Sequence, residues 1–182
     1  MTNNVHFGID PGKQGALACL RRTPLGMYVH HHILMPDRGD GMVDVHKVMS
    51  FLYEAMHLVG TNRLCRAVPQ ETIHICIEQQ GPRPKEGVRS VATNMENYGR
   101  LCAAAEVYAR EPQAVFRGVD LHFPPSQRWK KVLETGTDKA ASIALVKRLL
   151  PQVDLLPGRK RTPHDGIAEA YAMALWSMAT YD

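Results

Sequence analysis

The chain of 182 residues carries 22 Lys and Arg against 18 Asp and Glu, which gives a formal net charge of +4. This length predicts one domain over residues 1–182, and the 45% hydrophobic content argues against a disordered chain. No apolar run approaches the roughly 18 residues of a transmembrane helix, and the N-terminus lacks the features of a secretion signal. The weak positive charge permits a polyanionic partner without requiring one.

Four cysteines are scattered along the chain and form no CxxC pair: Cys19, Cys65, Cys76 and Cys102. We therefore expect neither a disulfide framework nor a zinc site. This cysteine usage fits a reducing compartment.

The first informative stretch is residues 5–20, where an apolar run ends in Asp10 and a second apolar run begins at Gly15. Pro11 and Gly12 predict a turn between two strands, because Pro presets φ and Gly permits a positive φ. A buried carboxylate must be paired or bind a metal ion. Asp10 is therefore either a turn-capping residue or a metal ligand.

Residues 27–34 predict a third strand, and residues 42–58 predict an amphipathic helix with Asp44 suited to its first turn. The three histidines at 30–32 would alternate between the two faces of the strand, so they cannot converge on one ion. We expect a solvated edge strand there.

Residues 72–77 predict a β-branched strand that ends in Glu78, much as the first strand ends in Asp10. If the two strands are neighbours, both acids reach the edge of the sheet at which open α/β sheets bind ligands. The alternative is that Glu78 only marks where the strand meets water. The following loop is either a phosphate-contacting loop or a solvated one, and its cations are Arg83, Lys85 and Arg89.

Residues 91–110 predict a helix with a small-residue face, and residues 114–123 predict a further strand. Ser126 is a candidate N-cap for a short helix, and Thr137 or Asp138 for a longer one through residue 150. Cations gather around these two helix starts, where backbone N–H groups also favour phosphate. A solvated basic face is the commoner explanation for any one of them: Arg128, Lys130, Lys131 and Lys139.

The last helix is predicted over residues 164–176, and its alanine-rich, apolar sequence should be mostly buried. Asp165 and Glu169 lie one turn apart on the same face. Two acids on the buried side of a helix need a cation, unless Asp165 only interacts with the helix dipole and Glu169 points outward. The loop before this helix is basic and contains Arg159, Lys160 and Arg161.

The candidate site therefore holds four carboxylates and no soft ligand: Asp10, Glu78, Asp165 and Glu169. Such a set favours Mg²⁺ or Mn²⁺ over zinc. It suits a two-metal site, which activates a water and stabilises the leaving oxygen of a phosphodiester. The surrounding Lys and Arg side chains would follow a phosphate backbone.

Three motifs in this order resemble the RuvC-type Holliday-junction resolvases of the RNase H-like superfamily. They are Gly8-Ile9-Asp10-Pro11-Gly12, Ile77-Glu78-Gln79, and the stretch 165–172; the basic stretch 126–131 is most similar to the phage and chloroplast branches. The resemblance implies an α/β RNase H-like fold, with a central mixed sheet flanked by helices on both faces. It also implies a homodimer with two Mg²⁺ ions in each active site, for which Mn²⁺ can substitute.

The activity that the resemblance implies is structure-selective cleavage of four-way DNA junctions in recombination and repair, by paired symmetric nicks. Asp10, Glu78 and Glu169 match metal ligands of the family, and Asp165 occupies a variable fourth position for which His164 is a substitute. The implied mechanism is in-line attack by a metal-bound water that leaves 5′-phosphate ends, with Lys139 or Lys130 stabilising the developing charge.

The two symmetric cuts imply a two-fold dimer, for which we expect the 91–110 helix to be the interface. We expect no membrane partner and a cytoplasmic or nucleoid-associated protein of a bacterial or phage-infected cell, or of an organelle. Alternatives are an RNase H-like nuclease acting on flaps, forks or structured RNA, and a non-catalytic junction-binding module. An actin-like ATP-binding protein is a weaker alternative, because the chain is too short for two such lobes.

Overall fold

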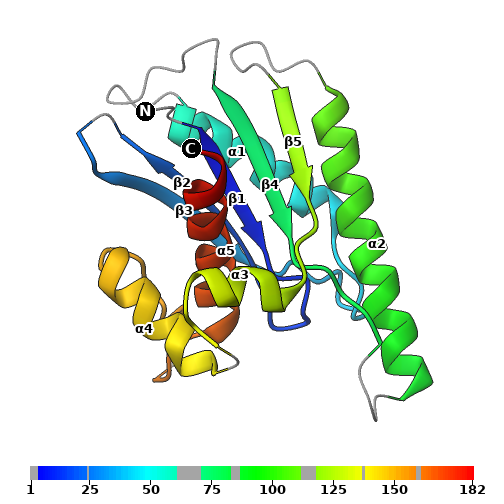
Figure 1. Ribbon diagram of the computed structural model, residues 1–182. Coiled ribbons are helices and arrows are strands. Elements are labelled where there is room, and N and C mark those ends of the chain that lie inside the picture. The colour runs from blue at the N-terminus through cyan, green and yellow to red at the C-terminus, as the bar shows by residue number, and fades with distance from the viewer. Residues whose placement is uncertain are drawn as a thin grey trace.

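The computed structural model describes residues 4–23, 25–60, 71–82, 87–111, 118–136, 138–158 and 161–182. Within these residues the strands form one five-stranded sheet in the order β3-β2-β1-β4-β5 (Figure 1). β1 pairs antiparallel with β2, and β2 with β3, whereas β1 and β4, and β4 and β5, run parallel. The strands are β1 (Val5–Ile9), β2 (Ala16–Arg22), β3 (Tyr28–Leu34), β4 (Thr72–Ile77) and β5 (Gly118–His122).

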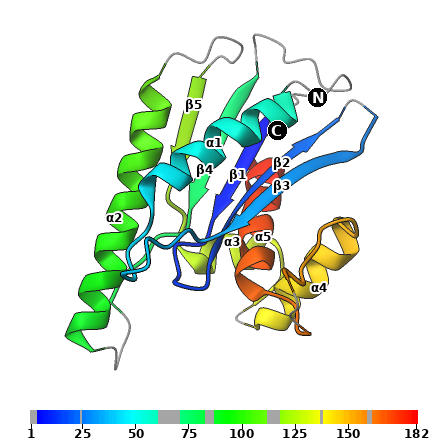
Figure 2. The same ribbon diagram turned by 180° about the vertical axis from the view of Figure 1, so that it is seen from behind.

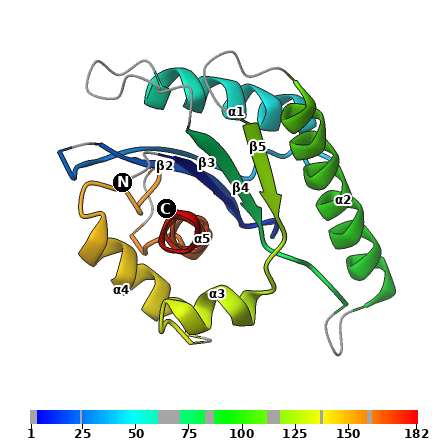
Figure 3. The same ribbon diagram turned by 45° about the horizontal axis from the view of Figure 1, so that its top comes forward.

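Helices cover both faces of this mixed sheet, as predicted. α1 and α2 lie on one face (Figure 2), and α5 lies on the other face with α3 and α4 around it (Figure 3). The helices are α1 (Val45–Gly60), α2 (Val88–Arg110), α3 (Ser126–Val132), α4 (Lys139–Leu149) and α5 (Asp165–Tyr181). None of the helices in the described ranges has the length and apolar character needed to cross a membrane.

α5 is the buried centre of its layer, because every residue from Gly166 to Met178 is buried. Its backbone approaches β1 at Gly8, where an added Cβ would lie 2.0 Å from the carbonyl oxygen of Ala170. Only glycine, which has no Cβ, allows this approach. The close contact fixes the position of α5 over the sheet and therefore of the acids that its first turns carry.

The opposite face of the sheet packs against α1 and α2 through an apolar core. Phe7 of β1 meets Phe51 of α1 edge to face, with ring centroids 6.1 Å apart. Leu101 of α2 is completely buried in the same core. Burial of side chains of this size stabilises the fold by about 1.5–3 kcal/mol each.

The starts of α3 and α1 differ from the sequence prediction, whereas the start of α4 agrees with it. Ser126 is the first residue of α3 rather than its N-cap, which is Pro125, and α3 begins without a side-chain cap hydrogen bond. Asp138 is the N-cap of α4, as predicted, and its Oδ1 accepts a hydrogen bond from the Ala140 N–H at 2.9 Å. Asp44 precedes α1 and accepts from the Lys47 N–H at 3.2 Å.

The three histidines of the edge strand β3 alternate between the faces, but they are half-buried rather than solvated. His30 Nδ1 and His32 Nδ1 lie 3.3 and 3.0 Å from the hydroxyl oxygen of Tyr171 on α5. His31 stacks on Phe51 of α1. The difference arises because helices cover both faces of this edge strand.

The described cysteines form no disulfide. Cys19, Cys76 and Cys102 have free thiols, and Cys65 lies outside the described residues. The predicted strand over residues 114–123 is described only from residue 118 onward, where β5 begins.

Candidate active site

Two acids meet at one end of the sheet because their strands are parallel neighbours. Ile9 of β1 pairs with Ile77 of β4, so Asp10 and Glu78 follow at matching positions. The Glu78 N–H donates to the Ile9 carbonyl oxygen at 3.1 Å and extends the ladder up to the acids. Both carboxylates are buried, as the sequence led us to expect for acids carried to one sheet edge.

Asp10 also caps the turn that follows it. This cap does not conflict with the proposed role of Asp10 as a metal ligand, because a carboxylate has a second oxygen. Its Oδ1 accepts a hydrogen bond from the Gly12 N–H at 3.0 Å. Gly12 does not adopt a positive φ, contrary to the sequence expectation. The residue that the turn needs is Gly15, because a Cβ there would lie 2.0 Å from the Asp10 carbonyl oxygen.

The first turns of α5 bring the other two acids to the same place. His164 is the N-cap, and its Nδ1 accepts from the Ile167 N–H at 3.4 Å. An added Cβ at Gly166 would lie 2.2 Å from the Gln14 carbonyl oxygen, so the helix start packs tightly on the β1–β2 turn. Glu169 is buried rather than pointing outward, and Asp165 is partly buried beside it.

All four acids line one open cleft of about 390 Å³, together with two lysines from α3 and α4. Lys130 Nζ donates to Glu169 Oε1 at 2.6 Å, and Lys139 forms an ion pair with Asp165. The cleft is lined by Asp10, Gly12, Gln14, Gly15, Glu78, Ser126, Lys130, Lys139, Asp165 and Glu169.

Burial and neighbouring charges shift the pKa values of two acids in the cleft, Asp10 and Asp165. Burial raises the pKa of Asp10 to about 7 against the lowering effect of the Gly12 N–H, and the charges of Glu78, Glu169 and Asp165 add to the rise. Partial burial opposes ionisation of Asp165, but the hydrogen bond and charge of Lys139 outweigh it and hold its pKa below the usual value.

The side chains that line the cleft fit a divalent cation. The donor set consists of hard carboxylate oxygens, which suits Mg²⁺ or Mn²⁺. Burial first, and then the charges of three neighbouring acids, raise the pKa of Asp10. A divalent ion bound by these carboxylates would favour their ionised forms.

The sequence matches no protein-family model and no curated protein. Solved structures do match. A T. thermophilus RuvC in complex with a Holliday junction substrate is 14% identical, with a TM-score of 0.52, over 98% of this chain and 96% of that chain. A Thermus thermophilus RuvC structure is 19% identical, with a TM-score of 0.51, over 97% of this chain and 96% of that one.

The fold is RuvC-like. This likeness covers nearly the full length of both chains, and at these identities it concerns the fold.

Several predicted residues lie away from the acid cleft of this RuvC-like fold. His164 is buried as the cap of α5 and does not line the cleft. Arg128 lies over the ring of Trp176 at 5.9 Å. The exposed cations Arg89, Lys131 and Arg161 do not line the cleft either, and Arg83, Lys85, Arg159 and Lys160 lie outside the described residues.

Gln14 and Ser126 line the cleft without having been predicted to do so. Ser126 lies one helical turn before Lys130 on α3, and that spacing is the signal that could have identified it. Gln80 was also missed as a partner of Glu78: its Nε2 donates to Glu78 Oε2 at 3.3 Å.

Proposed function

We propose that the protein is a divalent-metal-dependent endonuclease that resolves four-way DNA junctions by paired, symmetric nicks. The observation that carries the proposal is the convergence of four acids and two lysines in one cleft of a RuvC-like fold. One similar RuvC structure contains a Holliday junction substrate, and that likeness supports the choice of substrate. Such an enzyme would act in DNA recombination and repair, in the cytoplasm or nucleoid.

Asp10, Glu78, Asp165 and Glu169 would hold two Mg²⁺ ions, with Mn²⁺ as a substitute. When bound, these ions supply an activated water and stabilise the leaving oxygen of the scissile phosphodiester, which leaves 5′-phosphate ends.

Lys130 and Lys139 would bind the scissile phosphate and stabilise the charge that develops on it. Both ammonium groups already lie in the cleft, beside Glu169 and Asp165. If the four acids held a divalent cation, the ammonium groups of Lys130 and Lys139 would be available to the phosphate oxygens. The other predicted cations would contact the DNA backbone: Arg83, Lys85, Arg89, Arg128, Lys131, Arg159, Lys160 and Arg161.

The proposed enzyme is a homodimer, because two symmetric cuts on a two-fold junction require two active sites. The outward face of α2 supports this assignment, since it carries apolar and small residues. Val88 is 88% exposed and Met95 is 37% exposed, and Gly99 is exposed on the same side of the helix.

The test is cleavage mapping on a mobile four-way junction, a flap and a fork with end-labelled arms, in Mg²⁺, Mn²⁺ and EDTA. We expect symmetric paired nicks on the junction in either metal. Asp10→Asn and Glu78→Gln should each lower the cleavage rate by at least about 100-fold, because each removes a negative ligand. Both variants should still bind the junction in EDTA, and Glu54→Gln, an exposed acid of α1, should cleave normally.

Undiminished cleavage by either cleft variant would refute the site. Preference for flaps, forks or structured RNA would favour a different RNase H-like nuclease. Junction binding without turnover in any metal would favour a non-catalytic binding module.

A further inference from the structure

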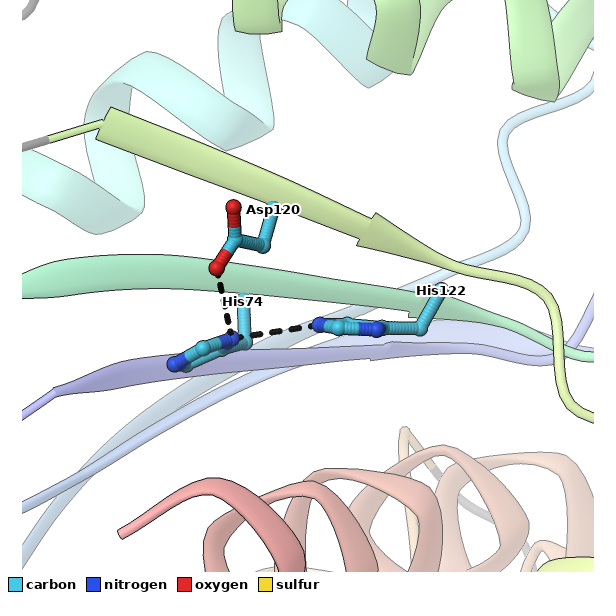
Figure 4. Close-up of side chains that lie close together, drawn as sticks. All are labelled: His74, Asp120 and His122. Atoms are coloured by element: carbon cyan, nitrogen blue, oxygen red, sulfur yellow. Dashed lines mark hydrogen bonds and ion pairs between the residues drawn. The ribbon is translucent and has the colours of Figure 1, made fainter.

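A second cluster of side chains that could ligate a metal lies on β4 and β5 (Figure 4). None of its residues lines the acid cleft. His74 pairs with Asp120 across the two parallel strands, and His122 follows two residues later on the same face. His74 Nδ1 lies 3.1 Å from His122 Nε2 and 3.8 Å from Asp120 Oδ2. One ligand atom from each residue lies within 4.8 Å of the others.

We propose that His74, Asp120 and His122 bind one divalent transition-metal ion of the zinc type. Two imidazoles and a carboxylate suit Zn²⁺, Co²⁺ or Ni²⁺ and not Mg²⁺. Nitrogen ligands about 2.0–2.1 Å from a tetrahedral ion lie about 3.3 Å apart, close to the spacing of the two histidines. Asp120 has a 61% exposed side chain, which can turn to close its longer distance and leaves a path for the ion.

Aromatic packing and burial hold the two imidazoles in position. Tyr181 stacks on His74 and His122, with ring centroids 5.0 and 4.1 Å apart. His74 is 5% exposed. Burial, followed by the neighbouring histidines His6 and His122, lowers the pKa of His74 to about 4, and burial also lowers that of His122.

Asn4 holds the far nitrogen of His74. Its Oδ1 accepts from the Thr72 N–H at 2.9 Å, and its Nδ2 lies 3.3 Å from His74 Nε2. This amide donates to Nε2, so the ring hydrogen sits on Nδ1 and is shared with His122. Metal binding at Nδ1 would require the ring hydrogen to be on Nε2, where a carboxylate could accept it and the Asn4 NH₂ group could not.

The bound ion would cross-link the edge strand β5 to β4, because its ligands come from both strands. It lies apart from the nuclease site, since His74 precedes Glu78 by four residues, roughly 13 Å along an extended strand. The inference therefore stands independently of the proposed nuclease activity. The cysteine pattern could not indicate such a site, because none of its ligands is a cysteine.

The experiment titrates the full chain, without a histidine tag, with ZnCl₂ by calorimetry and with CoCl₂ by visible absorption. Both titrations contain 10-fold more Mg²⁺ than transition metal, to occupy the acid cleft. We expect one Zn²⁺ per chain, a tetrahedral Co²⁺ spectrum and a rise in Tm of several degrees. His122→Phe keeps a ring against Tyr181 but removes a ligand, so it should weaken binding at least 100-fold.

Three further variants test the second ligand, the partner of His74 and the specificity of the effect. Asp120→Asn, at an exposed position, should weaken binding about 10-fold and decides the outcome if His122→Phe does not fold. Asn4→Asp should tighten binding 10-fold or more by accepting the Nε2 hydrogen. His32→Phe, the same substitution in the β3 histidines, should bind as wild type. Binding that is absent, or unchanged in both His122→Phe and Asp120→Asn, would overturn the proposal.

Discussion

At the residue scale, the proposed role of Asp10 as a metal ligand conflicts with its contribution to the stability of the fold. It is buried at the end of β1, and its pKa is raised to about 7 by burial and by the charges of three nearby acids. The ionised form that a metal site needs is therefore the form that the metal-free fold disfavours. This conflict is typical of residues selected for function rather than for stability.

Replacing Asp10 by Asn should stabilise the metal-free protein at pH 8 by about 2–4 kcal/mol. In the unfolded chain the pKa of Asp10 is the ordinary 3.8. Between pH 4 and 7 the native state therefore holds a proton that the unfolded state lacks, so the stability contribution of Asp10 falls as the pH rises. The substituted amide keeps an acceptor for the Gly12 N–H and does not titrate.

Urea unfolding in EDTA measures this difference. The stability gap between Asp10→Asn and wild type should shrink toward zero near pH 4, where Asp10 is protonated in both states. If the difference in unfolding free energy were the same at pH 4 and pH 8, the raised pKa of native Asp10 would not be its cause.

Lys130 is the residue that should compete with a metal ion for Glu169. Its ammonium group lies 2.6 Å from Glu169 Oε1, and both side chains are mostly buried. Lys130→Met should lower the Mg²⁺ concentration needed for half-maximal junction cleavage several-fold, because it removes the competing cation. It should also lower the maximal rate by about 100-fold, because it removes a phosphate contact.

A Mg²⁺ titration of the cleavage rate tests both effects. Lys147→Met, an exposed lysine of α4 outside the cleft, is the control and should behave as wild type. An unchanged Mg²⁺ requirement in Lys130→Met would argue against competition at Glu169.

At the scale of elements, the contact between α5 and β1 determines where the acids lie. The backbone of α5 lies against Gly8, so the helix has no room to move closer or to shift. Asp165 and Glu169 are carried by the first turns of the same helix. The geometry of the site therefore depends on a packing contact that involves none of the acids directly.

Substituting Gly8 by Ala should destabilise the protein by about 3 kcal/mol and reduce cleavage, because the added Cβ meets helix backbone that cannot rotate away. The matched control is Gly99→Ala in the exposed face of α2, where a Cβ would meet nothing within 4 Å. There alanine should stabilise the helix by about 0.5–1 kcal/mol. Chemical unfolding measures both changes, and equal effects at the two positions would contradict the packing argument.

At the scale of the whole molecule, the acid cleft lies apart from the proposed dimer face. The cleft is lined by the residues that follow β1 and β4 and by the first turns of α5; Figure 1 shows these strand ends beside the start of that helix. α2 lies on the opposite face of the sheet (Figure 3), and its outward side is the proposed contact with a second copy. A dimer through α2 would leave the cleft of each copy accessible to DNA.

Met95→Lys should weaken this dimer at least 10-fold, because it places a charge in an apolar contact. Val107→Lys is the control on the same helix: Val107 is 54% exposed but points about 120° away from Met95 around the helix axis. Light scattering across a dilution series measures the dissociation. A monomeric wild type, or equal weakening by both variants, would exclude α2 as the interface.

Much of this fold follows from local sequence patterns. Apolar runs that end in Asp10 and Glu78 determine two buried strands with acids at their ends, and the alanine-rich pattern after residue 164 determines a buried helix. These features are local, because strand and helix periodicity depends on neighbouring residues. The mixed sheet with helices on both faces was predicted through the family resemblance rather than through periodicity.

Only the tertiary structure decided which distant residues meet. The pairing of Ile9 with Ile77 aligns the two strand-end acids, and the approach of α5 to Gly8 sets its acids beside them. The lysine partners and the His74 cluster come from elements far apart in sequence. Such contacts depend on packing and register across the whole chain, and no local pattern encodes them.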